Sequence, residues 1–318
     1  MIMNDLFDDA FEGMKPKLVR LEGDITHDRI RETIRLFIDS GGLPLAYAFD
    51  IDFSQIGFVD PAGVTALTNI SFYLHQQGCT LNAQGELTHY QGNAGSRFLD
   101  DVGFYHLVMG RPFRADVCCP THARPIYKLE WQGYSNWFYN QTVPWLASML
   151  RAAPDVPNQW GEMYTVLGEI FANIKDHAGE NAQIASVYME YYPQKNEIHI
   201  AISDFGVGIP ANVRRIKPEL TNDTGAIMQA IEDGFTTKSV PANRGAGLDT
   251  LIKNVVISNG GTVKIVSWFG EADFYRRDDS TLRAKFPLFD IIDCYPGTLI
   301  YLTMPVTIET DELEDMQW

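Results

Sequence analysis

The chain has 318 residues and a formal net charge of −16, with 45% hydrophobic and 21% charged residues. These proportions are typical of a globular protein, and the acidic balance disfavours a nucleic-acid partner, because basic side chains must hold the phosphates. No stretch approaches the roughly 20 apolar residues that cross a bilayer, and the acidic N-terminus does not resemble a secretory signal. We therefore expect a cytoplasmic protein with no membrane partner.

Short strands and helices alternate in the first half of the chain. Strands are predicted in 17–23, 46–60 and 79–85, and helices in 26–42, 61–78 and 96–108. The helix over 61–78 has proline near its start and glycine at its end, which is the usual placing of both residues. This alternation predicts an α/β layer unit, with helices packed on a sheet.

The stretch from 110 to 131 is rich in proline and polar residues and reads as a connection. It separates the alternating first half from a second half of different character. The predicted division is an N-terminal arm 1–16, a first unit 17–110, a linker 111–140, a second unit 141–308 and an acidic tail 309–318.

One long amphipathic helix opens the second unit, and strands follow it. The helix is predicted over 161–178 from an apolar stripe at helical spacing. Strands are predicted in 184–192, 196–204, 261–267 and 297–305. Because short connections join neighbouring strands, we expect a mixed, largely antiparallel sheet covered on one face by helices, an α+β sandwich.

The polar side of the long helix carries Glu169 and Asn173, which are helical neighbours four residues apart. A carboxylate can orient or deprotonate a hydroxyl or water, and an amide oxygen is a ligand that suits Mg²⁺. A polar helix face can equally be an ordinary solvated face.

Three further segments carry candidate chemistry. Asp204-x-Gly206-x-Gly208 ends a strand with a hydrogen-bond acceptor and two residues that let a ligand approach the backbone. The segment 234–248 offers Lys238 and Arg244 as countercharges for phosphate, before a helix start. Gly297-Thr298 opens the last strand. Taken singly, these read equally as a tight turn, a surface loop and a common strand start.

The order and spacing of the four segments resemble the GHKL ATP-binding superfamily. Its members include histidine kinases, DNA gyrase, MutL-type repair ATPases, heat-shock chaperones and serine kinases that act as anti-sigma factors. The resemblance covers about 140–305 and implies a GHKL (Bergerat) α/β sandwich that binds ATP and Mg²⁺.

The resemblance also implies roles for individual residues. Asp204 would bind the adenine amino group, Thr298 would lie near the base, Asn173 would hold Mg²⁺, and Glu169 would be the catalytic base or orient the attacking group. Gly206, Gly208 and Ile209 would let the nucleotide approach. A segment from about 211 to 244 would cover the phosphates. Their contacts would come from Thr237, Lys238, Arg244, Gly245, Ala246, Gly247 and Leu248. Asp176 and His177 have open roles.

Residues 57–83 are similar to the STAS domain of anti-sigma-factor antagonists, and the likeness extends loosely over 17–110. In the regulated antagonists a phosphorylatable serine follows the strand-terminal aspartate. Here Asp60 is followed by Pro61 and Ala62, which have no hydroxyl. The resemblance therefore implies a docking or sensing module without that phosphorylation switch. A proline-initiated helix in a common α/β pattern is the alternative.

Three functions stay open at this point. The chain would be a regulatory ATPase, an ATP-dependent protein (serine) kinase, or a nucleotide-binding switch without turnover that acts through protein–protein contacts. The resemblance points to a protein partner of the anti-sigma or STAS type, and many relatives form dimers, so a homodimer is also an expectation.

Overall fold

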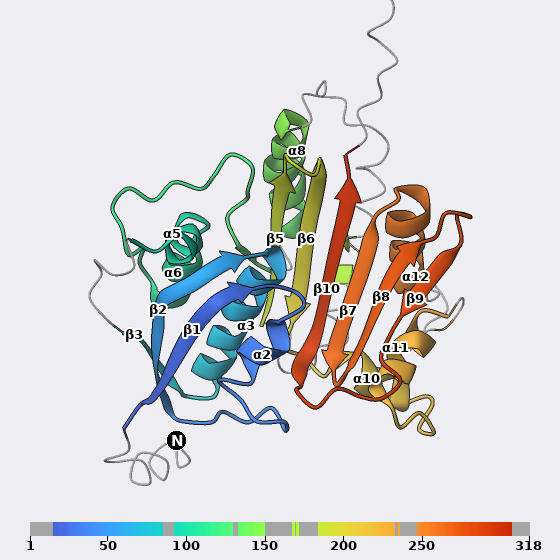
Figure 1. The fold of residues 1–318 in the computed structure, drawn as a ribbon, viewed down its shortest axis with the longest axis horizontal. Coiled ribbons are helices and arrows are strands. Elements are labelled where there is room, and N and C mark those ends of the chain that lie inside the picture. Colours follow the sequence, from blue (N-terminus) through green and yellow to red (C-terminus); the bar gives the residue numbers. More distant parts are fainter. Residues whose placement is uncertain are drawn as a thin grey trace, which may run out of the picture.

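The computed structural model describes residues 15–84, 92–129, 133–149, 167–168, 170–171, 184–232, 235 and 247–306. The described chain is built around two sheets. A three-stranded sheet belongs to the first unit, and a seven-stranded sheet belongs to the second (Figure 1).

The first unit has a parallel sheet in the order β1-β2-β3. Its elements are β1 (Lys17–Ile25), α2 (Ile30–Ile34), β2 (Ala48–Val59), α3 (Pro61–Gln76), β3 (Thr80–Ala83), α5 (Ala94–Asp101) and α6 (Phe104–Met109). The Asp60 carboxylate caps α3 by accepting from the Gly63 N–H, and Pro61 occupies the first helical position, where its missing N–H is no loss. The predicted α/β layer is confirmed.

Two predicted helices of the first unit differ from the structure. In the segment 26–42 only Ile30–Ile34 is α-helical, because Leu36 and Phe37 donate to carbonyls three residues back and the chain then turns. The single helix expected over 96–108 is two helices. Gly103 lies between them with a φ of 90°, which a continuous helix does not allow.

The second unit has a seven-stranded sheet in the order β4-β5-β6-β10-β7-β8-β9, in which every described pairing is antiparallel. Its strands are β4 (Tyr127–Lys128), β5 (Ala185–Tyr192), β6 (Glu197–Asp204), β7 (Thr262–Trp268), β8 (Gly270–Arg276), β9 (Leu282–Lys285) and β10 (Tyr295–Pro305). The antiparallel pairing predicted for 184–192 with 196–204 is confirmed. The edge strand β4 comes from the stretch that was expected to be a linker.

The helices of the second unit are mostly short. They are α7 (Tyr134–Trp137), the π-helical turn η1 (Phe138–Thr142), α8 (Val143–Met149), α10 (Gly208–Arg214), α11 (Asp223–Ala230), α12 (Gly247–Ile252) and the π-helical turn η4 (Lys253–Ser258). Leu167, Ile170 and Phe171, from the predicted stripe of the long helix, are buried in the core that these helices form with one face of the sheet.

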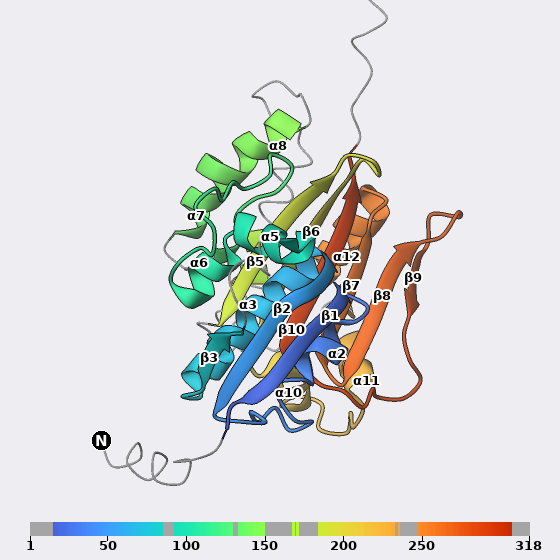
Figure 2. The same ribbon diagram turned by 60° about the vertical axis from the view of Figure 1, so that its left-hand side comes forward.

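The opposite face of the seven-stranded sheet is covered by the first unit, whose helix α3 packs on β5 and β6 (Figure 2). Tyr188, Ala201 and Leu299 of the large sheet share one hydrophobic core with the residues of β1, β2 and α3. The two units therefore form one continuous body, in which the large sheet is the middle layer.

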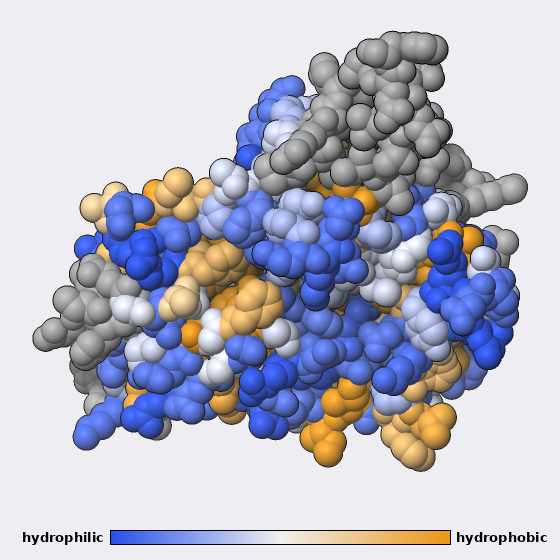
Figure 3. Space-filling model, turned by 45° about the horizontal axis from the view of Figure 1, so that its top comes forward, coloured by the Kyte–Doolittle hydropathy of each residue, from blue (hydrophilic) through white to orange (hydrophobic). Residues whose placement is uncertain are grey.

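The visible surface is largely hydrophilic, with apolar side chains gathered in separate patches (Figure 3). The most exposed large apolar side chains are Leu288, Phe289 and Ile292, in the connection between β9 and β10. Within the described residues, every helix is too short or too polar to traverse a bilayer.

Candidate functional site

Three polar side chains form a row across the middle of the large sheet. Thr298 of β10 lies opposite Asp204 of β6 on one side and opposite Ser267 of β7 on the other. Asp204 is 5% exposed, Thr298 9% and Ser267 0%. Because side chains two residues apart share a face of a strand, this row continues the apolar face formed by Ile202, Ile300 and Ile265. We call these three residues the polar row.

Burial changes the acid–base behaviour of Asp204. Its pKa is raised to about 7, mainly because the protein interior disfavours the charged carboxylate. The Gly206 N–H donates to Oδ1 at 2.8 Å and opposes this shift. Asp204 is thus an acceptor poised to change protonation near neutral pH.

The glycines near Asp204 are required by the packing of the chain itself. Gly208 has a φ of 79°, and a Cβ there would lie 2.6 Å from Trp268 Cδ1 and 2.9 Å from the Gly297 oxygen. Gly297 has a φ of 77°, and a Cβ there would lie 2.2 Å from the Asp204 carbonyl oxygen. Since both positions have positive φ as well as no room, glycine is the residue that fits.

Ser267 joins the segments of the site, although sequence reasoning did not single it out. Its hydroxyl donates to the Gly297 carbonyl at 2.6 Å and accepts from the Ile209 N–H at 3.0 Å. It also lies 3.2 Å from the Thr298 hydroxyl. One feature of the sequence could have indicated Ser267: its hydroxyl ends the predicted strand 261–267, just as the Asp204 carboxylate ends the predicted strand 196–204.

Several predicted site residues lie outside the described residues: Glu169, Asn173, Asp176, His177, Thr237, Lys238, Arg244, Gly245 and Ala246. Of the predicted phosphate contacts, Gly247 begins α12, and Leu248 is half-buried and packs against the second core. Within the described chain, no cluster of three or more histidine, cysteine or acidic side chains is arranged to hold a metal ion.

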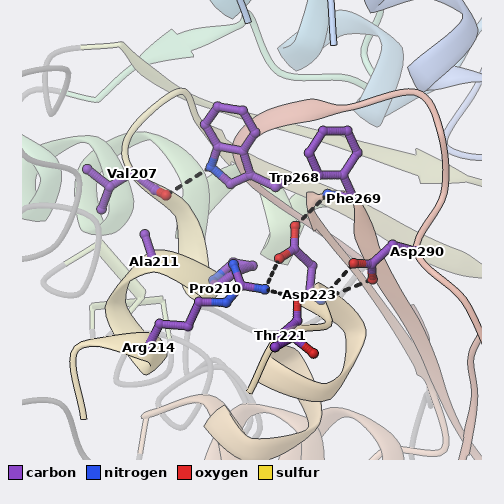
Figure 4. A pocket seen from close by; sticks show the side chains of 9 residues that line it. All are labelled: Val207, Pro210, Ala211, Arg214, Thr221, Asp223, Trp268, Phe269 and Asp290. Atoms are coloured by element: carbon purple, nitrogen blue, oxygen red, sulfur yellow. Dashed lines mark hydrogen bonds and ion pairs between the residues drawn. The ribbon is translucent and has the colours of Figure 1, made fainter. Parts of the chain in front are cut away.

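Part of the predicted phosphate-covering segment is helical. Residues 208–214 form α10 and 223–230 form α11, and these helices pack on β7, β8 and β10. A cavity of about 530 Å³ lies beside them (Figure 4). Its lining is Val207, Pro210, Ala211, Arg214, Thr221, Asp223, Trp268, Phe269 and Asp290.

The charged groups of this cavity are bonded to one another. Asp223 accepts from the Arg214 guanidinium and from the Phe269 N–H, and the Asp290 carboxylate accepts from the Asp223 N–H. These bonds hold the start of α11 against the hairpin of β7 and β8. No residue of the polar row lines the cavity, which adjoins the glycine turn through Val207.

The strand-terminal aspartate of the first unit is also buried. Asp60 is 3% exposed, and its carboxylate accepts from the N–H groups of Gly63 and His27 and lies 2.7 Å from His27 Nδ1. His27 in turn stacks on Tyr301 of the large sheet, with ring centroids 4.3 Å apart. The loop around Asp60 therefore lies at the boundary between the two units.

The comparisons with known proteins place few constraints on this chain. No protein-family model matches it, and no curated protein matches it. Among solved structures, the ATPase and transducer domains of DNA topoisomerase II from Balamuthia mandrillaris match with a TM-score of 0.27 and 16% identity, over 45% of this chain and 37% of that one. The chain thus spans little more than a third of that structure, and a likeness at this level does not define the fold.

Proposed function

We propose that the chain is an ATP- and Mg²⁺-binding regulatory protein of GHKL type, with ATPase or protein-kinase activity. The observation that carries the proposal is the polar row, in which a buried carboxylate and a hydroxyl lie opposite each other at the end of an apolar sheet face. A purine needs this combination, because its faces are apolar and its edge must be satisfied by hydrogen bonds.

The carboxylate of Asp204 gives the site a preference between purines. Adenine carries an amino group at C6, which can donate to a carboxylate. Guanine carries a carbonyl oxygen at the same position, which cannot donate to the ionised carboxylate of Asp204. A buried acceptor left unpaired is costly, so ATP is expected to bind more tightly than GTP.

The residues proposed for the triphosphate come from the sequence. Asn173 would hold Mg²⁺, and Glu169 would orient or deprotonate the attacking group. Thr237, Lys238, Arg244 and the backbone from Gly245 to Leu248 would contact the phosphates. Because phosphoryl transfer depends mostly on positioning and charge compensation, the same arrangement could deliver phosphate to water or to a protein hydroxyl.

We propose that the first unit is a STAS-like module that serves docking or sensing. Its helix α3 packs on the large sheet of the same chain, and twelve of the helix residues are buried. A protein partner of the anti-sigma or STAS type would therefore meet another surface of this unit. The packing of α3 places the first unit on the sheet face opposite to the polar row.

Nucleotide titration tests the proposal. Wild-type protein with Mg²⁺ should bind ATP more tightly than GTP, and the D204N variant should lose roughly 10- to 100-fold in ATP affinity, the value of a hydrogen bond to a charged group. Wild-type affinity in D204N would contradict the assignment of the base pocket.

Labelled ATP separates the three outcomes for turnover. Released phosphate indicates hydrolysis, a labelled protein indicates kinase action, and tight binding alone indicates the alternative, a switch without turnover. The E169A variant should bind ATP as the wild type does and lose turnover. If turnover survives in E169A, Glu169 is not the base.

A further inference from the structure

Trp268 occupies a backbone position that tryptophan rarely adopts. It opens the two-residue turn between β7 and β8, with Ser267 and Gly270 paired on either side, and its φ is 50°. Such turns favour glycine or asparagine at positive φ, and another residue there costs on the order of 1–3 kcal/mol. We therefore expect the Trp268 side chain to make contacts that offset this cost.

The indole of Trp268 holds the glycine turn that follows Asp204. Its Nε1 donates to the Val207 carbonyl at 2.9 Å, and its ring fills the space beside Gly208. Val207 lies between the two glycines of the Asp204-x-Gly206-x-Gly208 segment. The position of this turn relative to the polar row thus depends on where the indole stands.

The backbone of Trp268 is held from the other side by the first unit. Arg31 of α2 is 7% exposed, and its guanidinium donates to the carbonyl oxygens of Trp268, Gly270 and Asp293. It also lies 3.7 Å from the Glu271 carboxylate. One buried side chain of the first unit therefore fixes the β7–β8 turn and the segment that leads to Gly297.

The indole also packs against the core that the first unit shares with the large sheet. A Cβ added to Gly42 would lie 3.5 Å from the Trp268 ring, so this glycine lies beside the ring. Gly42 is held in turn by Tyr73 of α3, whose hydroxyl donates to its carbonyl at 2.7 Å. Trp268 thus lies between the first unit, which bonds its backbone, and the glycine turn, which its indole bonds.

We propose that the first unit sets the nucleotide affinity of the second through Arg31 and Trp268. Displacement of α2 would release the Trp268 carbonyl, and the indole would no longer hold Val207 and the turn beside Asp204. A signal received by the first unit would then change ATP binding without touching the nucleotide. The expected change in ATP affinity rests on the proposed function. The coupling of α2 to the glycine turn rests on the contacts described above.

The first test measures ATP affinity in R31M, with R35M as the matched control. Arg35 is near Arg31 and bonds the Asp293 carboxylate, but its side chain is 56% exposed and does not reach Trp268. R31M should weaken ATP binding about fivefold or more, within the usual range of couplings between sites, and R35M should leave it unchanged. Equal affinities for wild type and R31M would overturn the proposal.

The second test needs no nucleotide. Hydrogen exchange of the backbone amides of 206–209 should be faster in R31M and in W268F than in the wild type, and unchanged in R35M. W268F keeps an aromatic ring but loses the indole donor and the second ring of the indole, so it serves if R31M does not fold. Unchanged exchange in both variants overturns the coupling, whereas faster exchange in a protein that binds no ATP would support the coupling and overturn the proposed function.

Discussion

Asn69 of α3 and Ser203 of β6 are joined by a buried hydrogen bond of 2.8 Å that crosses from one unit to the other. The Asn69 amide oxygen also accepts from the Ser186 hydroxyl at 2.9 Å, and the Ser203 hydroxyl is bonded to Tyr295. The middle of the interface is thus a satisfied polar cluster inside a hydrophobic core. Such a cluster fixes one docking geometry, because a shifted helix would leave several buried groups unpaired.

Replacing Asn69 by Ala should destabilise the protein by about 1–3 kcal/mol, because Ser186 and Ser203 would each lose a hydrogen-bond partner in a buried interface. Asn82→Ala is the control, since the hydrogen bond of Asn82 to Asp50 is exposed. Its effect should stay within about 0.5 kcal/mol. Urea unfolding measures both, and equal effects of the two substitutions would show that the interface cluster contributes little.

Gly208→Ala should cost far more stability than Gly78→Ala, although both glycines have nearly the same φ, 79° and 81°. A Cβ at Gly78 meets nothing within 4 Å, so only the left-handed backbone penalty of about 1–2 kcal/mol applies. At Gly208 the same penalty is joined by overlap with Trp268 and the Gly297 backbone, which adds roughly 1–3 kcal/mol. Thermal unfolding of the two variants measures the difference, and similar melting temperatures would contradict the tight turn.

Asp204 should make the protein less stable at pH 8 than at pH 6. Its folded-state pKa is raised from 3.8 to about 7, so its contribution is full below 3.8 and is lost as the pH rises through 7. The loss between pH 6 and pH 8 should be roughly 1 kcal/mol. The side-chain amide of the D204N variant does not titrate, so the variant should lack this part of the pH dependence.

The comparison of wild type with D204N isolates Asp204 from another titrating group. Burial also raises the pKa of Glu190 to about 7, but Glu190 is present in both proteins and cancels in their difference. Denaturant unfolding at pH 6, 7 and 8 gives the required stabilities. A constant difference across this range would show that Asp204 does not titrate there.

The sequence predicted most strands because their alternation reflects a two-faced sheet directly. It also paired Asp204 with Gly297-Thr298 through a family pattern, and the register places Thr298 opposite Asp204. Ser267 and Trp268 were missed, because their roles depend on register and on a hairpin turn that local periodicity does not encode. Arg31 was missed for the same reason, since its partners lie more than 230 residues away along the chain.

The expected helix over 26–42 shows the limit of periodicity in a different way. Ile30, Ile34 and Phe37 are all buried as the spacing predicts. The α-helix nevertheless ends at Ile34, and Leu36 and Phe37 donate to carbonyls three residues back. Asp39 then accepts from the N–H groups of Gly41 and Leu43 and stabilises the turn that follows. Apolar periodicity does not report such side-chain bonds to the backbone.

A structure of the protein with a non-hydrolysable ATP analogue and Mg²⁺ would test the proposed base pocket without intermediate steps. We expect the adenine ring against the apolar sheet face, with its amino group within hydrogen-bond distance of the Asp204 carboxylate and near the Thr298 hydroxyl. An analogue found instead in the cavity between Arg214 and Trp268, or no bound nucleotide at millimolar concentration, would contradict it.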